Sequence, residues 1–352
     1  MRGRGDRLAE LVAARDLDLL LVTHLVNVRY LTGFEGTNGA CLCGEEKRLF
    51  LTDFRYTERA EREVEGWDVL TVSGEWLPGV AEQLAGRVGF EDDHLAVRTL
   101  AKLEAQAPDG VELRAAGELV EGQRRVKDEQ ELEAIAAAAQ LADEVYAWSL
   151  ERGLLGRAER EVARAAEARI RELGAEPSFP PIVAAGPNGA LPHAEPEERQ
   201  IGRDELVIFD MGAQLDGYCS DCTRTFATGE VGGDEVEVYE LVRRAQRAGL
   251  EAVAAGKEGR AVDAVARELI AGAGHGERFG HGLGHGVGLE VHEAPRLSSR
   301  SEDTLAAGEV VTVEPGVYLP GRFGVRIEDL VMVTEDGHRN LSGLAKELTV
   351  VG

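Results

Sequence analysis

The segment ELVIFDMGAQLDGYCSDCTRTFAT places aspartates among residues that favour β-strands. Its dipeptide Asp216-Gly217 is typical of a two-residue hairpin turn. With that turn, Asp210 lies opposite Thr223, and Asp221 is its diagonal neighbour on the same face, roughly 7–8 Å away. Because Asp210 ends the apolar run VIF, an unpaired carboxylate there would be costly to bury. We predict that Asp210 and Asp221 converge on one site; solvated strand-edge aspartates are the alternative.

Two glutamates are placed in a similar way nearer the C-terminus. In the segment EVVTVEPGVYLPGRFGVRIEDLVMV, Glu314 closes the run EVVTV and Glu328 lies between VRI and LVMV. Strand interiors disfavour glutamate, so a function is expected for both. Salt bridges to Arg322 or Arg326 are the alternative. The loop near Pro320 does not define a register, and the approach of the two glutamates is inferred from the pattern alone.

A third segment, FGHGLGHGVGLEVHEAP, has glycine at every second position from Gly280 to Gly288 and three histidines, His281, His285 and His292. On a β-strand this spacing leaves one face without side chains, so another backbone or a ligand can approach closely. The opposite face carries His281, Leu283, His285, Val287 and Leu289. The pattern is not a nucleotide-binding loop, because GxGxxG does not fit these positions and no GK[ST] follows.

Two aspartates, two glutamates and one histidine form an oxygen-rich ligand set that suits manganese, cobalt or zinc. Four carboxylates over-neutralise one divalent ion, whereas two ions about 3.5–4 Å apart balance their charge. Such a pair activates a water molecule and polarises a carbonyl or phosphoryl oxygen. A lone histidine on such a strand would more often be a core residue, but the combination favours a dinuclear metal site and hydrolysis.

The cysteines offer an alternative metal site, made of thiolates. They are Cys41, Cys43, Cys219 and Cys222. The first pair is one residue too close for a zinc-binding pair, and strand-forming residues surround both pairs. We interpret all four as buried free thiols.

The length of 352 residues indicates two domains. Up to about residue 120, the strand-like runs LDLLLV, RLFLTD, WDVLTV and RVGFED alternate with helix-like runs, which is typical of an α/β domain. This half shows no histidine cluster. Apolar residues at helical spacing across 124–151 predict the helix that opens a second domain, of α+β pattern. Further helices are predicted over 158–173, 235–254 and 261–272.

The formal net charge of −25 argues against nucleic acid as a partner, because phosphate contacts need clustered lysine and arginine. No apolar run approaches the length of a membrane span, so no membrane partner is expected. The stretch MRGRGDRLAELVAARDLDLLLV mixes charges into its apolar run, which disfavours a secretory signal. A cytoplasmic location is therefore expected.

Several motifs of the second half occur together in one known family. They are IVAAGPNGALPHAEP, IFDMGAQLDGYCSDCTRTF, GHGLGHGVGLEVHEAP, TVEPGVY and GVRIED. Their order resembles the pita-bread metallopeptidase family, which contains methionine aminopeptidase, aminopeptidase P and prolidase. The N-terminal half, with NVRYLTGFEGTNG, is similar to the creatinase-type domain of prolidase and aminopeptidase P. The resemblance implies an α/β creatinase-like domain over 1–123 and an α+β pita-bread catalytic domain over 124–352.

The resemblance also implies a role for each ligand-type residue. The family's five metal ligands fall on Asp210, Asp221, His285, Glu314 and Glu328. Asp221 and Glu328 would bridge two ions. Asp210 would bind one ion, and His285 and Glu314 would bind the other. Glu314 would also be the general base.

Further residues are implied to contact the substrate or to support the site. His292 and His193 would hydrogen-bond the scissile carbonyl and the tetrahedral oxyanion. His281 would line the pocket for proline or for the residue beyond it. Tyr318 and Arg326 would support the site, with Arg326 orienting a bridging glutamate or a substrate carboxylate.

The leading hypothesis is a dinuclear-metal exopeptidase that cleaves the bond before proline, a tertiary amide without an N–H donor. We favour a prolidase that acts on Xaa-Pro dipeptides, and an aminopeptidase P that acts on longer peptides is the alternative. The resemblance implies a homodimer, with manganese as the expected metal and cobalt or zinc as alternatives. A non-catalytic binding module and a creatinase-like amidinohydrolase are disfavoured, because both dispense with the five ligands.

Overall fold

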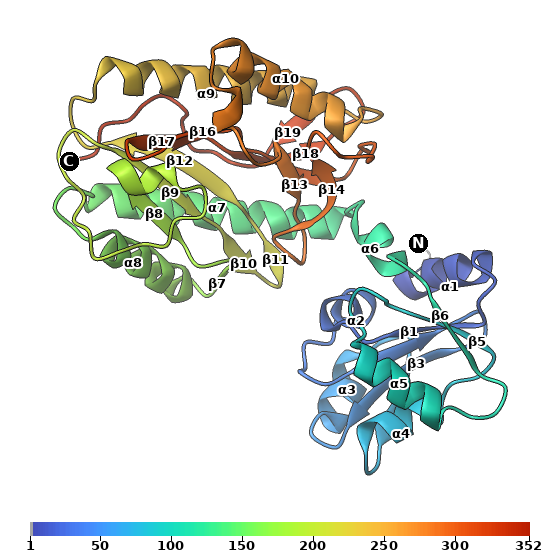
Figure 1. The fold of residues 1–352 in the computed structure, drawn as a ribbon. Helices are drawn as coiled ribbons and strands as arrows, with labels where there is room; N and C mark the ends of the chain where they lie inside the picture. Colours follow the sequence, from blue (N-terminus) through green and yellow to red (C-terminus); the bar gives the residue numbers. More distant parts are fainter. Residues whose placement is uncertain (1–2) are drawn as a thin grey trace. The chain divides into compact units, whose positions relative to one another are not determined.

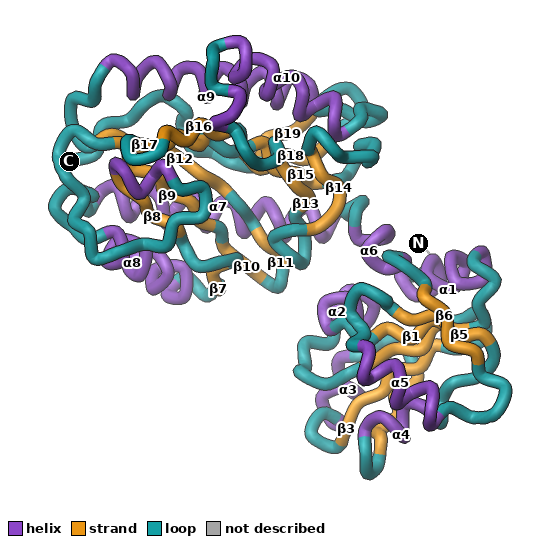
Figure 2. Tube along the Cα trace, in the orientation of Figure 1, coloured by secondary structure: helices purple, strands orange, loops and turns teal. Residues whose placement is uncertain are grey.

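The computed structural model describes residues 3–352, which form two compact units divided after Arg124. The N-terminal unit, coloured blue to teal in Figure 1, alternates helices with strands. The C-terminal unit, coloured green to red, holds its strands between helices. Figure 2 shows the same elements coloured by type.

The N-terminal unit is built on a six-stranded sheet with the order β4-β3-β2-β1-β5-β6. Its strands are β1 (Leu19–Val22), β2 (Ala40–Cys43), β3 (Arg48–Asp53), β4 (Asp68–Val72), β5 (Arg87–Phe90) and β6 (Glu112–Ala115). Its helices are α1 (Arg4–Ala14), α2 (Leu25–Thr32), α3 (Thr57–Glu63), α4 (Trp76–Ala81), α5 (Val97–Gln106) and α6 (Leu119–Arg124). The neighbours β1, β5 and β6 run parallel, whereas β2 is antiparallel to β1 and β3. The predicted α/β alternation is confirmed, and β2 and β6 lie outside the strand-like runs of the sequence.

The C-terminal unit has sheets with the strand orders β11-β10-β7, β12-β9-β8, β14-β13-β15-β18-β19 and β16-β17. The first strands are β7 (Glu176–Pro177), β8 (Ile182–Ala185), β9 (Leu206–Met211), β10 (Ala213–Leu215), β11 (Tyr218–Cys219) and β12 (Cys222–Ala227). The later ones are β13 (Gly284–Gly286), β14 (Glu293–Leu297), β15 (Val310–Val313), β16 (Gly316–Leu319), β17 (Phe323–Arg326), β18 (Asp329–Val333) and β19 (His338–Asn340). All of these pairings are antiparallel, as expected for an α+β domain.

Four long helices cover these strands. They are α7 (Glu129–Glu151), α8 (Glu159–Glu172), α9 (Gly233–Ala252) and α10 (Gly259–Gly272). A short 3₁₀ helix, η1 (Gly186–Ala190), follows β8, and another, η2 (Gly276–Arg278), follows α10. In Figure 1 the strands lie between the pair α7 and α8 and the pair α9 and α10, and each pair has its own apolar core against the sheets. The helices predicted over 158–173, 235–254 and 261–272 are confirmed.

Helix α7 begins within the predicted region and positions two strands of the site. Asp128 and Glu131 form a reciprocal capping box, each side chain accepting a hydrogen bond of 3.0 Å from the other's backbone N–H. Farther along, the hydroxyl of buried Tyr146 lies 2.9 Å from Phe209 O and 2.7 Å from Cys222 O. Helix α7 therefore fastens β9 to β12.

The hairpin predicted around Asp216-Gly217 is confirmed. Both residues have positive φ angles, 47° and 80°, as a two-residue turn of this kind requires. Past the turn, Asp210 pairs with Thr223 in the β9–β12 ladder, as the sequence predicts. Asp221 lies one residue before β12, close to the same end of the ladder.

A second hairpin places the two glutamates. Strand β15 pairs with β18, with Val313 opposite Asp329, and β16 pairs with β17, with Gly316 opposite Arg326. The residues between these pairs follow the same register, which puts Glu314 opposite Glu328. A three-residue loop with Gly321 at φ 73° closes the hairpin. The length of this loop sets the register, and it could not be read from the sequence.

The glycine-rich segment forms a shorter strand than the period-two pattern predicts. Strand β13 spans only Gly284–Gly286, because its register with β14 shifts after His285. The glycines of this strand are nevertheless required, because neighbouring backbone oxygens leave no room for a side chain. A Cβ atom on Gly284 would lie 1.9 Å from Thr312 O, and one on Gly286 would lie 2.2 Å from Ala294 O.

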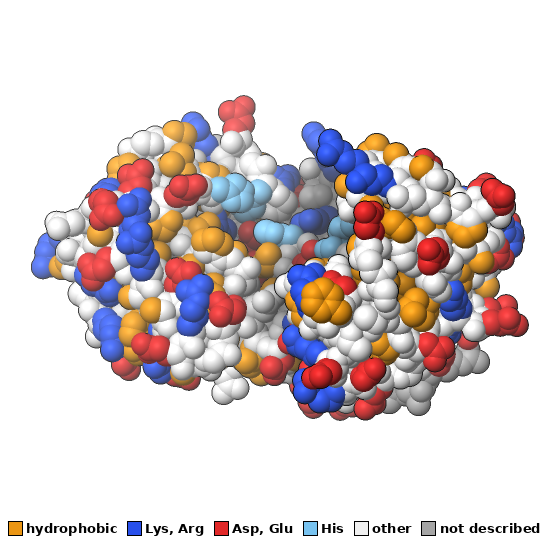
Figure 3. Space-filling model, turned by 90° about the horizontal axis from the view of Figure 1, so that it is seen from below, with side chains coloured by type: hydrophobic (Ala, Val, Ile, Leu, Met, Phe, Trp, Pro, Cys, Tyr) orange, Lys and Arg blue, Asp and Glu red, His pale blue; other side chains and the backbone are white. Residues whose placement is uncertain are grey.

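Across residues 3–352, no helix combines the length and apolarity needed to cross a membrane. Figure 3 shows one face of the molecule, on which acidic and basic side chains are interspersed. The four cysteines are buried and form no disulfide, which confirms their interpretation as free thiols.

Candidate active site

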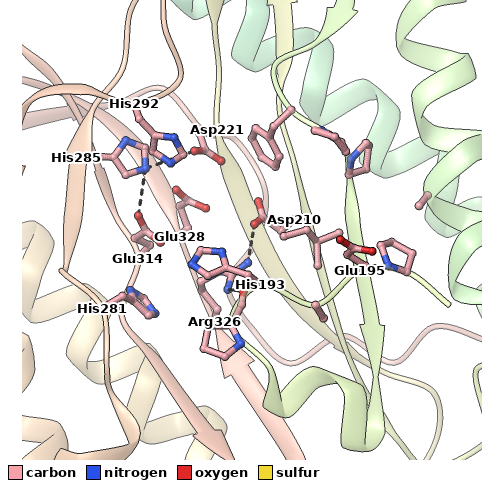
Figure 4. Close-up of a pocket in the computed structure, with 18 of the residues that line it drawn as sticks. His193, Glu195, Asp210, Asp221, His281, His285, His292, Glu314, Arg326 and Glu328 are labelled. Atoms are coloured by element: carbon pink, nitrogen blue, oxygen red, sulfur yellow. Dashed lines mark hydrogen bonds and ion pairs between the residues drawn. The ribbon is translucent and has the colours of Figure 1, made fainter. Parts of the chain in front are cut away.

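The fold brings together the five ligand-type residues that the sequence singles out. They are Asp210 in β9, Asp221 between β11 and β12, His285 in β13, Glu314 directly after β15, and Glu328 between β17 and β18. All five line one cavity of about 790 Å³ in the C-terminal unit, shown in Figure 4. Four of them are buried, and Glu314 is partly exposed.

His285 is oriented toward the carboxylates. Its Nε2 atom lies 3.3 Å from Glu314 Oε1 and 3.6 Å from Asp221 Oδ2. Its Nδ1 atom lies 3.1 Å from Gly286 O and donates to that carbonyl, so Nε2 is the ring atom that faces the carboxylates. Ligand atoms of Asp221, His285 and Glu328 all lie within 4.8 Å of one another. This spacing is compatible with a shared metal ion.

Asp210 is held by a buried arginine. Arg326 Nη2 donates to Asp210 Oδ2 at 2.5 Å, and its other donors bind Thr223 Oγ1, Pro192 O and Tyr318 OH, each at 3.0 Å. The second carboxylate oxygen, Asp210 Oδ1, is buried and accepts no hydrogen bond from any described residue. A buried anionic oxygen without a donor calls for a cation.

Two threonines hold the two glutamates and were not selected from the sequence as site residues. Thr223 Oγ1 donates to Glu328 Oε2 at 2.7 Å, and Thr312 Oγ1 donates to Glu314 Oε1 at 3.1 Å. Thr312 Oγ1 also accepts from the backbone N–H of His285 at 3.1 Å. The signal for Thr223 was its position opposite Asp210, whereas Thr312 is indistinguishable in sequence from an ordinary strand residue.

The electrostatics show a surplus of negative charge. Burial, and then the charge of Glu328, raise the pKa of Asp221 well above its usual range. Burial and then Glu314 do the same to the pKa of Glu328, and burial also raises the pKa of Asp210. Burial opposes the ionisation of Glu314 too, but its hydrogen bond to His285 and the charge of that ring lower its pKa to about 2. Cations in the cavity would remove the cost of ionising the other three.

The other predicted histidines line the same cavity. The ring of His292 packs edge-on against that of His285, with centroids 4.3 Å apart. Burial, and then the charges of His285 and Arg296, lower the pKa of His292 to about 4, so this ring is neutral at pH 7. His281 Nε2 lies 2.9 Å from the hydroxyl of Tyr318, which Arg326 contacts in turn. Figure 4 shows His193 on the opposite wall from His292.

The loop that carries His193 is fastened by a buried carboxylate. Glu159, at the start of α8, is fully buried. It accepts hydrogen bonds from Ala185 N at 2.8 Å, from Asn188 Nδ2 at 3.0 and 3.2 Å, and from Glu197 N at 3.1 Å. Both ends of the loop are therefore tied to α8. This role is not visible in the sequence, because a glutamate in a first helical turn is common.

Arg296 also lines the cavity and was missed. It lies in β14, directly opposite His285 in the β13–β14 ladder, and its side chain is exposed. The only signal in the sequence was its position four residues after His292. Unlike Arg326, its guanidinium forms no hydrogen bond or ion pair with a carboxylate of the cavity wall within residues 3–352, so its charge faces the open space.

The fold and this cavity define a two-domain metal-dependent hydrolase, in which two hairpins supply carboxylates opposite an imidazole. The chain belongs to metallopeptidase family M24, which it matches over residues 133–335. Residues 4–126 match the creatinase/prolidase N-terminal domain. The predicted fold class, a creatinase-type domain followed by a pita-bread catalytic domain, is thereby confirmed.

Similarity to individual proteins extends over the whole chain. The Xaa-Pro dipeptidase of Pyrococcus furiosus is 33% identical, with 99% of this chain and 100% of that protein covered. Among solved structures, a Xaa-Pro dipeptidase from Bacillus anthracis has 38% identity and a TM-score of 0.95, covering 99% of both chains. An X-Pro aminopeptidase from Thermotoga maritima has 33% identity and a TM-score of 0.90, covering 98% of this chain and 100% of that chain.

Proposed function

We propose that this protein is a cytoplasmic Xaa-Pro dipeptidase that uses two divalent metal ions, with manganese as the preferred metal. The observation that carries the proposal is the convergence of Asp210, Asp221, His285, Glu314 and Glu328 in one cavity. It is supported by similarity to Xaa-Pro dipeptidases over the whole chain. The decisive assay strips the metal, adds back manganese, cobalt or zinc, and measures hydrolysis of Ala-Pro; no activity with any metal would contradict the proposal.

The ligand roles follow from the placement of each side chain. Asp221 and Glu328, the two buried carboxylates with strongly raised pKa values, are assigned to both ions, because each needs the most positive charge. Asp210 is assigned to one ion through its Oδ1 atom, which accepts no hydrogen bond from any described residue. His285 and Glu314 are assigned to the other ion. Bound metal supplies a lowered pKa for a water molecule and polarisation of the scissile carbonyl.

The remaining steps belong to the chain itself. Glu314 is ionised at neutral pH and borders the cavity, so it accepts the proton of the attacking water. His292 is neutral there, and its N–H donates to the carbonyl oxygen as charge develops on it. His193 does the same from the opposite wall. His281 and Tyr318 form a hydrogen-bonded pair that shapes the pocket for proline.

The proposal of a dipeptide substrate rests on the arginines that line the cavity. Because Arg326 already binds Thr223, Pro192, Tyr318 and Asp210, we assign it to positioning Asp210. Arg296 is the better partner for the carboxylate of proline, since it lines the cavity and is exposed. An arginine holds a carboxylate with two parallel hydrogen bonds.

Substrate length tests this assignment. We expect hydrolysis of Ala-Pro to exceed that of Ala-Pro-Ala and of Ala-Pro-amide, because both lack the proline carboxylate. Arg296→Ala should raise KM for Ala-Pro roughly tenfold to hundredfold, the effect of losing hydrogen bonds to a charged group. Arg300→Ala is the matched control, as Arg300 is exposed nearby but does not line the cavity. Faster cleavage of the tripeptide would instead identify an aminopeptidase.

Metal removal should destabilise the protein in a pH-dependent way. Asp210, Asp221 and Glu328 have raised pKa values, so their contribution to stability is full below their ordinary values near 4 and is lost as pH rises through the raised ones. Glu314 acts oppositely, but its contribution changes only below its ordinary pKa of 4.5. Thermal melts should therefore show the stripped protein losing stability from pH 5 to 8, and the loaded protein losing less. Parallel curves would contradict this account.

The domain division and assembly are also proposals. We assign residues 1–123 to the creatinase-like domain and 124–352 to the catalytic domain, in accord with the two compact units and the two family matches. We propose a homodimer. Light scattering that gives the mass of a single 37.9 kDa chain would contradict the dimer.

A further inference from the structure

The N-terminal unit contains a pair of histidines that the sequence keeps far apart. The rings of His24 and His94 stack face to face, with centroids 3.7 Å apart and an angle of 7° between planes. Glu121 joins them, its Oε1 atom lying 3.2 Å from His94 Nε2. The sequence of this half shows no histidine cluster, and folding brings this pair together.

The three residues meet at the edge of the sheet where ligands usually bind. His24 lies just after β1, His94 lies four residues after β5, and Glu121 lies in α6, which follows β6. Because β1, β5 and β6 are parallel neighbours, their carboxyl ends share one edge. In open α/β sheets, ligands bind outside the carboxyl ends of such strands.

Buried Glu91 holds the backbone at both histidines, through its carboxylate at His24 and through its main-chain carbonyl at His94. Glu91, only 3% exposed, accepts hydrogen bonds from Thr23 N at 2.7 Å and from His24 N at 2.8 Å. Its backbone carbonyl accepts from His94 N at 3.2 Å. One residue thus holds the main chain at both histidines.

A buried amide orients the third group. Asn27 is fully buried, and its Nδ2 atom donates to Glu121 Oε1 at 2.5 Å and to Glu91 Oε1 at 2.7 Å. Arg124 Nη1 in turn donates to Asn27 Oδ1 at 2.8 Å. Such outer contacts are characteristic of metal sites, where they hold the ligands in place.

We propose that His24, His94 and Glu121 bind a divalent transition-metal ion of the zinc class. One ligand atom from each lies within 4.8 Å of the others. Two imidazoles and a carboxylate are ligands that zinc accepts, with solvent completing the tetrahedron. Because stacked rings direct their nitrogen lone pairs in parallel, binding one ion requires the ring of His94 to turn, and the exposure of His94 leaves room for this turn and for water. All of these residues belong to the N-terminal unit, so this site differs from the catalytic cavity.

The test counts zinc ions per chain. The wild-type protein and the variants His94→Ala and Glu121→Gln are dialysed against zinc at low micromolar concentration, and bound metal is measured by elemental analysis. The catalytic cavity is unchanged in all of them, so the difference isolates the new site. His275→Ala is the matched control, because His275 lies in the C-terminal unit outside the cavity.

We expect the wild type and His275→Ala to hold one more zinc ion per chain than His94→Ala and Glu121→Gln. Equal zinc in all four proteins would overturn the proposal. A second measurement does not depend on variants: in ¹H–¹⁵N spectra of histidine side chains, zinc should shift the signals of His24 and His94. Shifts that appear only at millimolar zinc would show adventitious binding and would also overturn it.

Discussion

Replacing Asp221 with alanine should empty both metal sites and reduce Ala-Pro hydrolysis by several orders of magnitude, and Glu328→Ala should do the same. Each substitution removes a carboxylate assigned to both ions. Each also leaves other buried carboxylates without compensation, which costs several kcal/mol of stability. Elemental analysis of the purified variants, together with circular dichroism to verify folding, measures the effect.

The matched control for this pair is Glu195→Ala. Glu195 lines the same cavity but is exposed and lies apart from the carboxylate cluster in Figure 4. This variant should retain both ions and most of its activity. Two ions per chain in Asp221→Ala or Glu328→Ala would show that the bridging assignment is wrong.

The second large effect is expected for His292. His292→Ala should retain both metal ions and lose on the order of 10²–10³ in kcat, the usual effect of removing one oxyanion donor. KM should change little, because the contact strengthens only as charge develops on the carbonyl oxygen. Steady-state kinetics and metal analysis on the same sample separate this from ligand loss.

The structure suggests a control for the His292 result. Removing the ring also removes its packing against His285, with centroids 4.3 Å apart. His292→Asn keeps an N–H donor and should recover part of kcat, whereas a purely structural role would leave both variants equally impaired. Unchanged turnover in His292→Ala would mean that the ring contributes to packing and not to catalysis.

The first carboxylate pair could be predicted because a short-range rule sets it. The Asp216-Gly217 turn fixes the register, and the register fixes which residue faces Asp210. The approach of Glu314 to Glu328 obeys the same rule, but the loop around Gly321 can close a hairpin in more than one way. The sequence therefore identifies the two glutamates but not their geometry.

Other features depended on contacts that are remote in sequence. Strand β13 is shorter than its glycine pattern suggests because its register with β14 shifts after His285. The pairing of His24 with His94 requires β1 and β5 to be neighbours, which no local pattern encodes. The hydrogen bonds of buried Glu159 likewise depend on where the chain returns 26 to 38 residues later.

The two hairpins have a consequence for protein engineering. Exposed loop tips are normally the first choice for inserting tags or reporter peptides. Here the tip at Asp216-Gly217 sets a ladder that runs on to Asp210, and the tip at Gly321 sets one that runs on to Glu314. An insertion that slips either ladder by one residue would turn a carboxylate to the opposite face of its sheet. Insertion libraries should spare both tips, although each is remote from the reacting atoms.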